Sequence, residues 1–209
     1  MNKVLLGILG ALALLVLVVG IAAVSTYNGL VNRSQGVDAQ WAQVQNVYQR
    51  RADLVPNLVA TVSGAANFEK STLAEITAAR ASVGKVSLSP GAAPTDPAQL
   101  AEFEKAQGQL SSALSRLLVV AENYPALRAT EGFRTLQAQL EGAENRIAVE
   151  RGKFNTASLD YNATIQRVPA VFFAAALGFK PKAYFAAAPG ADKPPAVQFD
   201  FSKPAAARP

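Results

Sequence analysis

The sequence contains no cysteine and no histidine. Without cysteine the chain forms no disulfide and no thiolate site, so redox chemistry does not indicate its compartment. Without histidine it lacks the commonest general base near neutral pH and the commonest zinc ligand. No nucleophile elbow, phosphate-binding loop, dinucleotide-binding motif or metal-binding helix pattern occurs either. We therefore expect no enzymatic activity, no cofactor and no metal site.

Concentrated charge is also lacking over most of the chain. The net charge is +5, but residues 180–209 contain five Lys or Arg and two Asp, which leaves only +2 on the first 179 residues. A nucleic-acid-binding domain gathers its basic residues on one face, so we expect no nucleic-acid partner. Residues 180–209 also hold six of the twelve prolines. This composition predicts an extended basic tail, in which the alternation of Val197, Phe199 and Phe201 favours a short strand.

One long apolar run stands near the start of the sequence. Val4–Val24 contains 21 residues without a charged side chain, and as a helix it would span about 31 Å, the thickness of the hydrocarbon core of a bilayer. A cleaved signal peptide is the alternative, because Ala23-Val24-Ser25 resembles a cleavage site. Secretory apolar regions are shorter, at about 7–15 residues. We therefore predict an uncleaved transmembrane anchor over residues 1–24, with membrane lipid as its partner.

Three long segments after the anchor have the apolar spacing of helices. They cover Tyr27–Val83, Ala98–Glu122 and Glu131–Val168, and proline-rich breaks separate them. Pro56 lies inside the first segment, where a kink is expected rather than an end. The apolar segment Phe172–Phe179 is too short to span a bilayer and favours a short helix. The predicted fold is all-α: a transmembrane helix, then an antiparallel bundle of three long helices and one short helix over residues 25–179.

Several charged residues fall on the apolar faces of these helices. A buried unpaired charge costs several kcal/mol, so such residues are expected to pair with one another. An ion-pair network that fixes the register of the helices is the favoured interpretation, with a functional polar pocket or simple exposure as alternatives. The residues of this predicted structural network are Arg51, Glu69, Glu144, Glu150 and Arg151. Asn155 and Asn162, seven residues apart, are expected to bond a neighbouring helix terminus in the core.

The predicted helix lengths do not match. The first helix beyond the membrane would measure about 85 Å and the second about 38 Å, so residues 27–52 would lack cover within one subunit. These residues carry an apolar face consisting of Val37, Trp41, Val44 and Tyr48. We expect this face to contact other copies of the chain; a different membrane partner or a fold-back at Pro56 is the alternative. The same geometry would place Phe172, Phe173 and Phe179 at the distal end, capping the bundle or docking on a neighbouring subunit.

Several short sequences resemble the bacterial LemA family. The first are Tyr27-Asn28-Gly29-Leu30-Val31 and Arg50-Arg51-Ala52-Asp53-Leu54-Val55-Pro56-Asn57-Leu58-Val59, and others occur at 121–125, 136–147 and 178–181. The resemblance implies a single-pass membrane protein with an antiparallel bundle of long helices and no established enzymatic activity. Where the family often has a histidine before Glu69, this chain has Phe68, so a proton or metal role for that position is not expected here.

These observations predict a membrane-anchored structural or scaffolding protein of the bacterial envelope that self-assembles through its long helices. The alternative is an accessory or sensory protein that binds a membrane or envelope protein through the bundle. Lys3 and the terminal amine precede the anchor, whereas Arg33 stands beside Asp38 after it. The positive-inside rule therefore favours a cytoplasmic N-terminus in the cytoplasmic membrane, with the body on the extracytoplasmic side.

Overall fold

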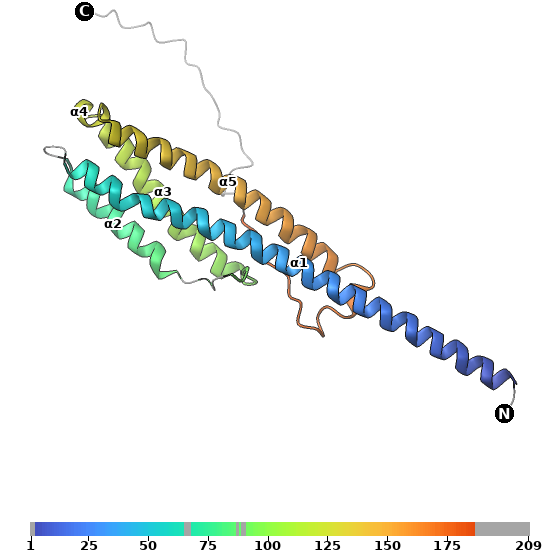
Figure 1. Cartoon of the computed structure of the whole chain (residues 1–209). Coiled ribbons are helices and arrows are strands. Elements are labelled where there is room, and N and C mark those ends of the chain that lie inside the picture. The colour runs from blue at the N-terminus through green and yellow to red at the C-terminus, as the bar shows by residue number, and fades with distance from the viewer. Residues whose placement is uncertain (1–2, 65–67, 87, 89–90, 187–209) are drawn as a thin grey trace, which may run out of the picture.

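The computed structural model describes residues 3–64, 68–86, 88 and 91–186. All regular structure in these residues is helical, with no strand. The predicted strand at Val197–Phe201 lies outside the described residues, as does most of the predicted tail. Figure 1 shows an elongated arrangement in which the first part of α1 projects beyond all other helices.

Helix α1 (Lys3–Ser63) is one continuous helix of 61 residues. It is the one helix in the described residues that is long and apolar enough to cross a membrane. No residue of the most apolar window of α1 is buried by the described part of the chain, and the large apolar side chains of Val4–Val24 are about half exposed or more. The second half of α1 differs, because Leu30 is buried and further buried residues recur every three or four positions from Val37 to Val62.

The first long helix ends earlier than predicted. It continues through Pro56, but it stops at Ser63, and a separate helix, α2 (Lys70–Lys85), follows. The prediction of one helix from Tyr27 to Val83 was therefore wrong. The Ser63-Gly64 pair is a turn signal, and Phe68, only 8% exposed, packs its ring 5.0 Å from that of Tyr124 after the turn. Burial of Phe68 favours the reversal over a longer helix.

Helices α2 and α3 (Pro97–Ala121) form an antiparallel pair. Glu75 lies 2.9 Å from Arg116, and near the other end Ser82 and Gly108 line one surface pocket. The start of α3 follows the sequence pattern, because the Asp96 carboxylate accepts a hydrogen bond of 2.8 Å from the amide of Ala98, behind Pro97.

The extra reversal changes the direction of every later helix. α3 runs toward the end of the molecule that lies far from Val24, the short helix α4 (Pro125–Arg128) turns the chain there, and α5 (Glu131–Ile165) returns. Ion pairs between α1 and α5 join Arg33 to Asp160 and Arg51 to Glu144, so the two helices are antiparallel along their length (Figure 1). Thr130 caps α5 by accepting a bond from the amide of Phe133.

Because α5 returns along α1, the lower part of α1 is covered within one chain. Val37, Trp41, Val44 and Tyr48 are all between 0% and 4% exposed. The prediction that residues 27–52 lack cover was therefore wrong, and these four side chains are core residues here instead of partner contacts.

The segment after α5 also lies at the opposite end from the prediction. The 3-10 helix η1 (Ala170–Phe172) contacts α1, and the ring of Phe179 lies 5.8 Å from that of Tyr27. Phe172, Phe173 and Phe179 are thus close to the apolar stretch of α1, not at the distal end. Phe173 and Phe179 are half-buried in the chain, whereas Phe172 is exposed.

Two hydrophobic cores lie along the molecule. The core near the apolar stretch of α1 contains Trp41, Phe103, Phe154 and Tyr161, and the distal core contains Leu58, Ile76 and Leu117 among others. The boundary between these cores is polar, because Arg51 lies there.

Candidate functional site

Arg51 is the most buried charged side chain in the described part of the protein, at 1% exposed. Its Nη1 donates to Glu144 of α5 and to the Ser111 hydroxyl of α3, both at 2.6 Å. Its Nη2 donates to the side-chain oxygen of Gln107 at 2.5 Å and to the backbone carbonyl of Gln107 at 3.2 Å. One guanidinium therefore joins α1, α3 and α5.

The surroundings of Arg51 differ on its two sides. The Glu144 side chain is 46% exposed, so the carboxylate is partly hydrated while the guanidinium is not. The Tyr48 ring lies 5.2 Å from the guanidinium carbon, a cation–π distance. Burial raises the pKa of Tyr48, against the opposing effect of the cations Arg151 and Arg51. Tyr48 therefore stays a neutral ring at physiological pH.

A second ion pair joins α3 and α5 beside this network. Arg151 donates to Glu104 at 2.5 Å, and its guanidinium carbon lies 4.4 Å from the centre of the Phe185 ring. The pKa of Glu104 is raised, because burial of its carboxyl outweighs the opposing effects of Arg151 and of a backbone hydrogen bond at Ala186. The pair is a contact between helices in a partly buried setting.

Two of the predicted network residues lie elsewhere. Glu150 pairs with Lys153 on its own helix at 2.8 Å, and Glu69 accepts a bond from the Thr72 hydroxyl at the start of α2. Of the predicted network, Arg51 and Glu144 form an ion pair with each other, whereas Arg151 pairs with Glu104. Sequence reasoning missed Glu104, Gln107 and Ser111, which are ordinary polar residues on α3. Their spacing of three and four residues along one helix face was the signal that could have found them.

An asparagine clamp, formed by Asn155 and Asn162 of α5, holds the chain that returns over the helices. The Asn155 side chain donates to the carbonyl of Phe185 and accepts from its amide, both at 2.9 Å. Asn162 makes the same two contacts with Lys182, both at 2.8 Å. The prediction that these asparagines bond a helix terminus was wrong, because their partner is the non-helical segment 182–185.

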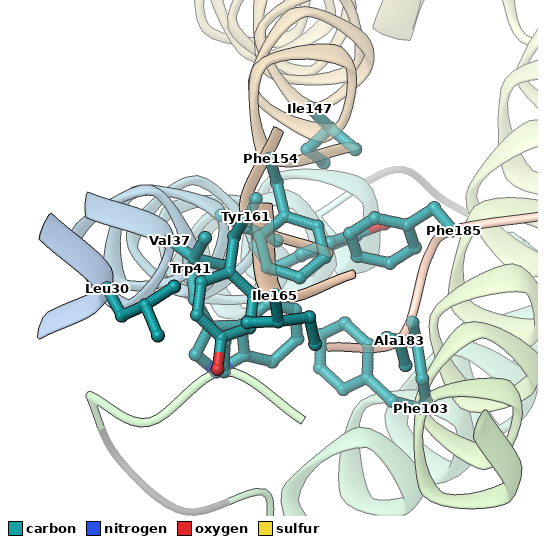
Figure 2. Close-up of a cluster of buried hydrophobic side chains, with 14 of the residues drawn as sticks. Leu30, Val37, Trp41, Phe103, Ile147, Phe154, Tyr161, Ile165, Ala183 and Phe185 are labelled. Atoms are coloured by element: carbon teal, nitrogen blue, oxygen red, sulfur yellow. The ribbon is translucent and has the colours of Figure 1, made fainter. Parts of the chain in front are cut away.

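This returning segment completes the core near Trp41 (Figure 2). Residues 180–186 were expected to begin an extended tail, yet Ala183 and Phe185 are each 5% exposed. Trp41 lies 5.3 Å from Phe154, 5.6 Å from Phe103 and 6.0 Å from Phe185, ring centre to ring centre. The segment is packed here because its alternate side chains fill the space between α1, α3 and α5.

Further polar contacts fix the same segment. Lys182, whose side chain is 9% exposed, donates to Asp38 of α1 at 2.8 Å, and Asp38 also accepts from the amide of Ala93. The amide of Ala183 donates to the carbonyl of Pro94 at 2.8 Å. The pKa of Tyr161 is raised, first by burial and then by the Asp38 carboxylate, against a hydrogen bond with Ser34. The segment thus joins three separate parts of the chain.

The described residues contain no group of three acidic, histidine or cysteine side chains that could hold a metal ion. Most polar groups of this region bind one another and the backbone, so the arrangement joins chain segments; Trp41 Nε1, Arg51 Nε and Ser158 Oγ are buried without a hydrogen-bond partner among the described residues. One surface pocket of about 340 Å³ lies beside the returning segment and is lined by Ser34, Tyr161 and Lys182 among others. Two larger pockets lie elsewhere: one of about 650 Å³ at the distal end, lined by Thr61 and residues 123–127, and one of about 640 Å³ between α1 and α5, lined by Arg50, Ala138, Gly142 and Arg146 among others.

The chain is similar to known proteins over two different extents. It is 34% identical over 89 residues to the magnetosome protein MamQ of Magnetospirillum gryphiswaldense, a match that covers 43% of this chain and 33% of MamQ. It is 35% identical over the same length to magnetosome proteins MamQ 1 and MamQ 2 of Paramagnetospirillum magneticum. The chain thus spans about a third of the length of these relatives. The LemA family model matches residues 40–199, about three quarters of the chain, and this protein belongs to the LemA family.

Proposed function

We propose that this protein is a membrane-anchored structural protein of the bacterial cytoplasmic membrane, without enzymatic activity, that self-assembles through its long helices. The observation that carries the proposal is the continuity of α1. One helix includes both the exposed apolar stretch Val4–Val24 and a packed half from Leu30 to Val62. The 39 residues from Ser25 to Ser63 span about 58 Å, so the distal end is held that far from the bilayer.

The interior chemistry supports a structural role. Arg51, Asn155 and Asn162 form hydrogen bonds with other segments of the chain, and Arg51 alone joins three helices. Polar groups committed in this way fix the register of helices. The relatives carry names that point in the same direction, because the MamQ proteins are named for the magnetosome and not for a reaction.

A groove between two long helices is the surface that we propose for self-assembly. The α1–α5 groove, defined as the pocket of about 640 Å³ between these helices, is lined in part by small residues such as Ala138 and Gly142. Small side chains let a second helix approach closely. Arg50 and Arg146 flank the groove and make no ion pair within the described residues, so they are available to carboxylates of another copy.

The test measures the mass of the full chain purified alone in detergent, by light scattering. A self-assembling protein elutes as an oligomer whose mass falls on dilution; a strictly monomeric protein at all concentrations overturns the proposal. Because the chain lacks cysteine, a single Ala138→Cys places one thiol in the groove. Ala148→Cys is the matched control. Position 148 is exposed on the same helix, about 80° around the helix axis from Ala138 and on the side away from the groove. Disulfide-linked dimers should form with Ala138→Cys and not with the control.

The second candidate is an accessory protein that binds an envelope protein through its distal end. The pocket of about 650 Å³ there, lined by Tyr124, Pro125, Ala126 and Leu127 among others, favours it. Such a protein stays monomeric when purified alone, and it gains mass only when membrane extract is added. Replacing Ala126 by Glu should prevent that gain, whereas Ala148→Glu should not.

The orientation in the membrane is proposed from charge. Lys3 precedes the apolar stretch, and the short region after it has Arg33 next in sequence, so the N-terminus is placed in the cytoplasm. Labelling Ala148→Cys in intact cells with a reagent that does not cross the membrane tests this. Labelling only after cell disruption would indicate the opposite orientation and would not contradict the anchor.

A further inference from the structure

We propose that the loop after α5 is a second membrane contact. The membrane-proximal loop, defined as residues 166–180, lays its exposed apolar side chains into the headgroup boundary of the bilayer that α1 crosses. The proposal rests on the membrane anchoring proposed above. Its occupant is lipid carrying anionic headgroups.

The position of the loop is the first observation. The Phe179 ring lies 5.8 Å from the ring of Tyr27, and Ala170 and Ala174 share a core cluster with Leu30. Along the axis of α1, Tyr27 and Leu30 stand about 5 Å and about 9 Å beyond Val24. Side chains that lie within about 10 Å of the hydrocarbon reach the headgroup layer. Figure 1 shows the loop wrapped around α1 where the helix leaves the other helices.

The exposure of the loop is the second observation. Nine large hydrophobic side chains beyond Val24 are exposed in the described residues, and five of them gather here. Phe172 is 71% exposed and Val168 is 74% exposed; the others are Tyr27, Val171 and Leu177. Exposed apolar side chains that cluster at one end of a protein mark an interaction surface, whereas single ones spread over a surface need no explanation.

The loop is held in shape by its own backbone. The amide of Ala174 donates to the carbonyl of Ala170 at 2.8 Å, and the amide of Leu177 donates to the carbonyl of Phe173 at 3.0 Å. The amide of Phe179 donates to the carbonyl of Ala174 at 2.9 Å. These hydrogen bonds fix the backbone with Ala170 and Ala174 buried. In this conformation Phe172 and Leu177 are exposed.

The charge of the loop selects the kind of lipid. Arg167 and Lys180 are exposed and make no ion pair in the described part of the chain. The nearby carboxylates form ion pairs with other cations: Asp38 pairs with Lys182, and Asp160 pairs with Arg33. The loop therefore carries two free positive charges beside its apolar side chains. Basic residues flanking apolar ones are what an interfacial segment presents to anionic headgroups.

The test uses the full chain in nanodiscs with a polarity-sensitive fluorophore on single cysteines. Ala176→Cys labels the loop while keeping Phe172 and Leu177, Ala148→Cys labels α5 far from the bilayer, and Ala13→Cys labels the anchor. Lipids carrying a shallow nitroxide quencher should lower the emission at position 176 at least twofold and leave position 148 unchanged. The label at position 13 should be quenched by a deep nitroxide.

The three positions separate the two proposals. Quenching at position 13 without quenching at 176 overturns the loop contact and leaves the anchor standing, whereas no quenching at position 13 overturns the anchor. A blue shift at 176 that requires two copies per disc, without nitroxide quenching, assigns the loop to a second copy and overturns the lipid assignment.

Two sets of variants test the residues named. Phe172→Ser with Leu177→Ser should reduce quenching at 176 to the level of position 148, with Trp41 emission unchanged as evidence of an intact core. Quenching at 176 should be greater with phosphatidylglycerol than with phosphatidylcholine. Arg167→Gln with Lys180→Gln should remove that difference. Equal quenching in both lipids for the unaltered loop overturns the role of the two cations.

Discussion

Asn155 and Asn162 lie seven residues apart on α5 and bind two backbone positions that are three residues apart on the returning segment. Seven residues of helix rise about 10.5 Å, and three residues of extended chain cover about 10 Å. The two repeats match, so both side chains bind at once without distorting either partner. The asparagine clamp thus depends on the heptad spacing of α5, in which each asparagine directly follows a buried ring, Phe154 or Tyr161.

Replacing Asn155 by Ala should release the returning segment near Phe185. Two hydrogen bonds are lost and two backbone groups lose their partners, which costs about 1–3 kcal/mol. Phe185 then leaves the ring of Trp41, the one tryptophan of the chain, and the Trp41 emission should shift to the red. Denaturant unfolding of the full chain in detergent, followed by Trp41 fluorescence, measures both effects. Asn145→Ala, at an exposed position of the same helix, is the control; equal effects of the two variants would contradict the clamp.

Removing Glu144 should destabilise the protein more than replacing Arg51 by an apolar residue of similar length. Glu144→Ala leaves the buried guanidinium with neutral partners only, at a cost of about 2 kcal/mol. Arg51→Met keeps most of the buried volume and removes the charge. The double variant should recover stability relative to Glu144→Ala. Unfolding free energies of the three variants give the comparison, and a greater loss with Arg51→Met would show that hydrogen bonds to α3 outweigh the charge.

The sequence predicted the helical class, two of the three long helices to within a few residues, and the apolar stretch near the N-terminus. These features depend on local patterns, such as the heptad from Phe133 to Tyr161 and the Asp96-Pro97 start of α3. It did not predict the turn after Ser63, because the apolar helical spacing continues beyond the Ser63-Gly64 pair, at Ile76 and Val83. That one missed reversal inverted the direction of every later element, and with it the placement of Phe172.

The polar contacts were less accessible from sequence for a different reason. Arg51 stood on a buried face, so a partner was required, but any carboxylate on a neighbouring helix could supply it. The choice of Glu144 over Glu69 depends on which helix lies beside α1 at that height. The partners of Asn155 lie on a non-helical segment whose only local signal is alternation at Ala183 and Phe185. Long-range pairing of this kind has no counterpart in local periodicity.

The raised pKa of Glu104 predicts how stability changes with pH. Since the folded protein holds this proton more tightly than the unfolded chain, the group stabilises the fold at low pH. That contribution is lost as the pH rises from about 4.3, the ordinary glutamate pKa, through the raised pKa of the folded state. Glu104→Gln stays neutral and should gain stability relative to the wild type over this window. Unfolding series between pH 4 and pH 7 measure the difference.

A matched variant controls for net charge in that experiment. Glu141→Gln removes the same charge from an exposed position of α5, where the side chain accepts a hydrogen bond from Gln137 on its own helix. The difference between the two variants isolates the burial of Glu104. If the wild type instead gained stability over Glu104→Gln as the pH rose, the attraction of Arg151 would outweigh burial.

The turn between α1 and α2 predicts a short distance between Asp53 and Ala81. In one continuous helix these residues would be separated by 28 positions, or about 42 Å. With the turn, α2 runs back along α1, and the Arg80 Nε lies 3.2 Å from the carbonyl of Ala52. Spin labels on Asp53→Cys with Ala81→Cys, both exposed, should therefore report less than about half the distance of the continuous helix. Dipolar spectroscopy on the full chain in detergent measures this distance.

A second pair of labels is the control. Asp53→Cys with Gln40→Cys, 13 residues apart on α1, should give the spacing of an unbroken helix, about 20 Å along the axis. A distance near 42 Å for the first pair would restore the long single helix and with it an uncovered lower face on α1.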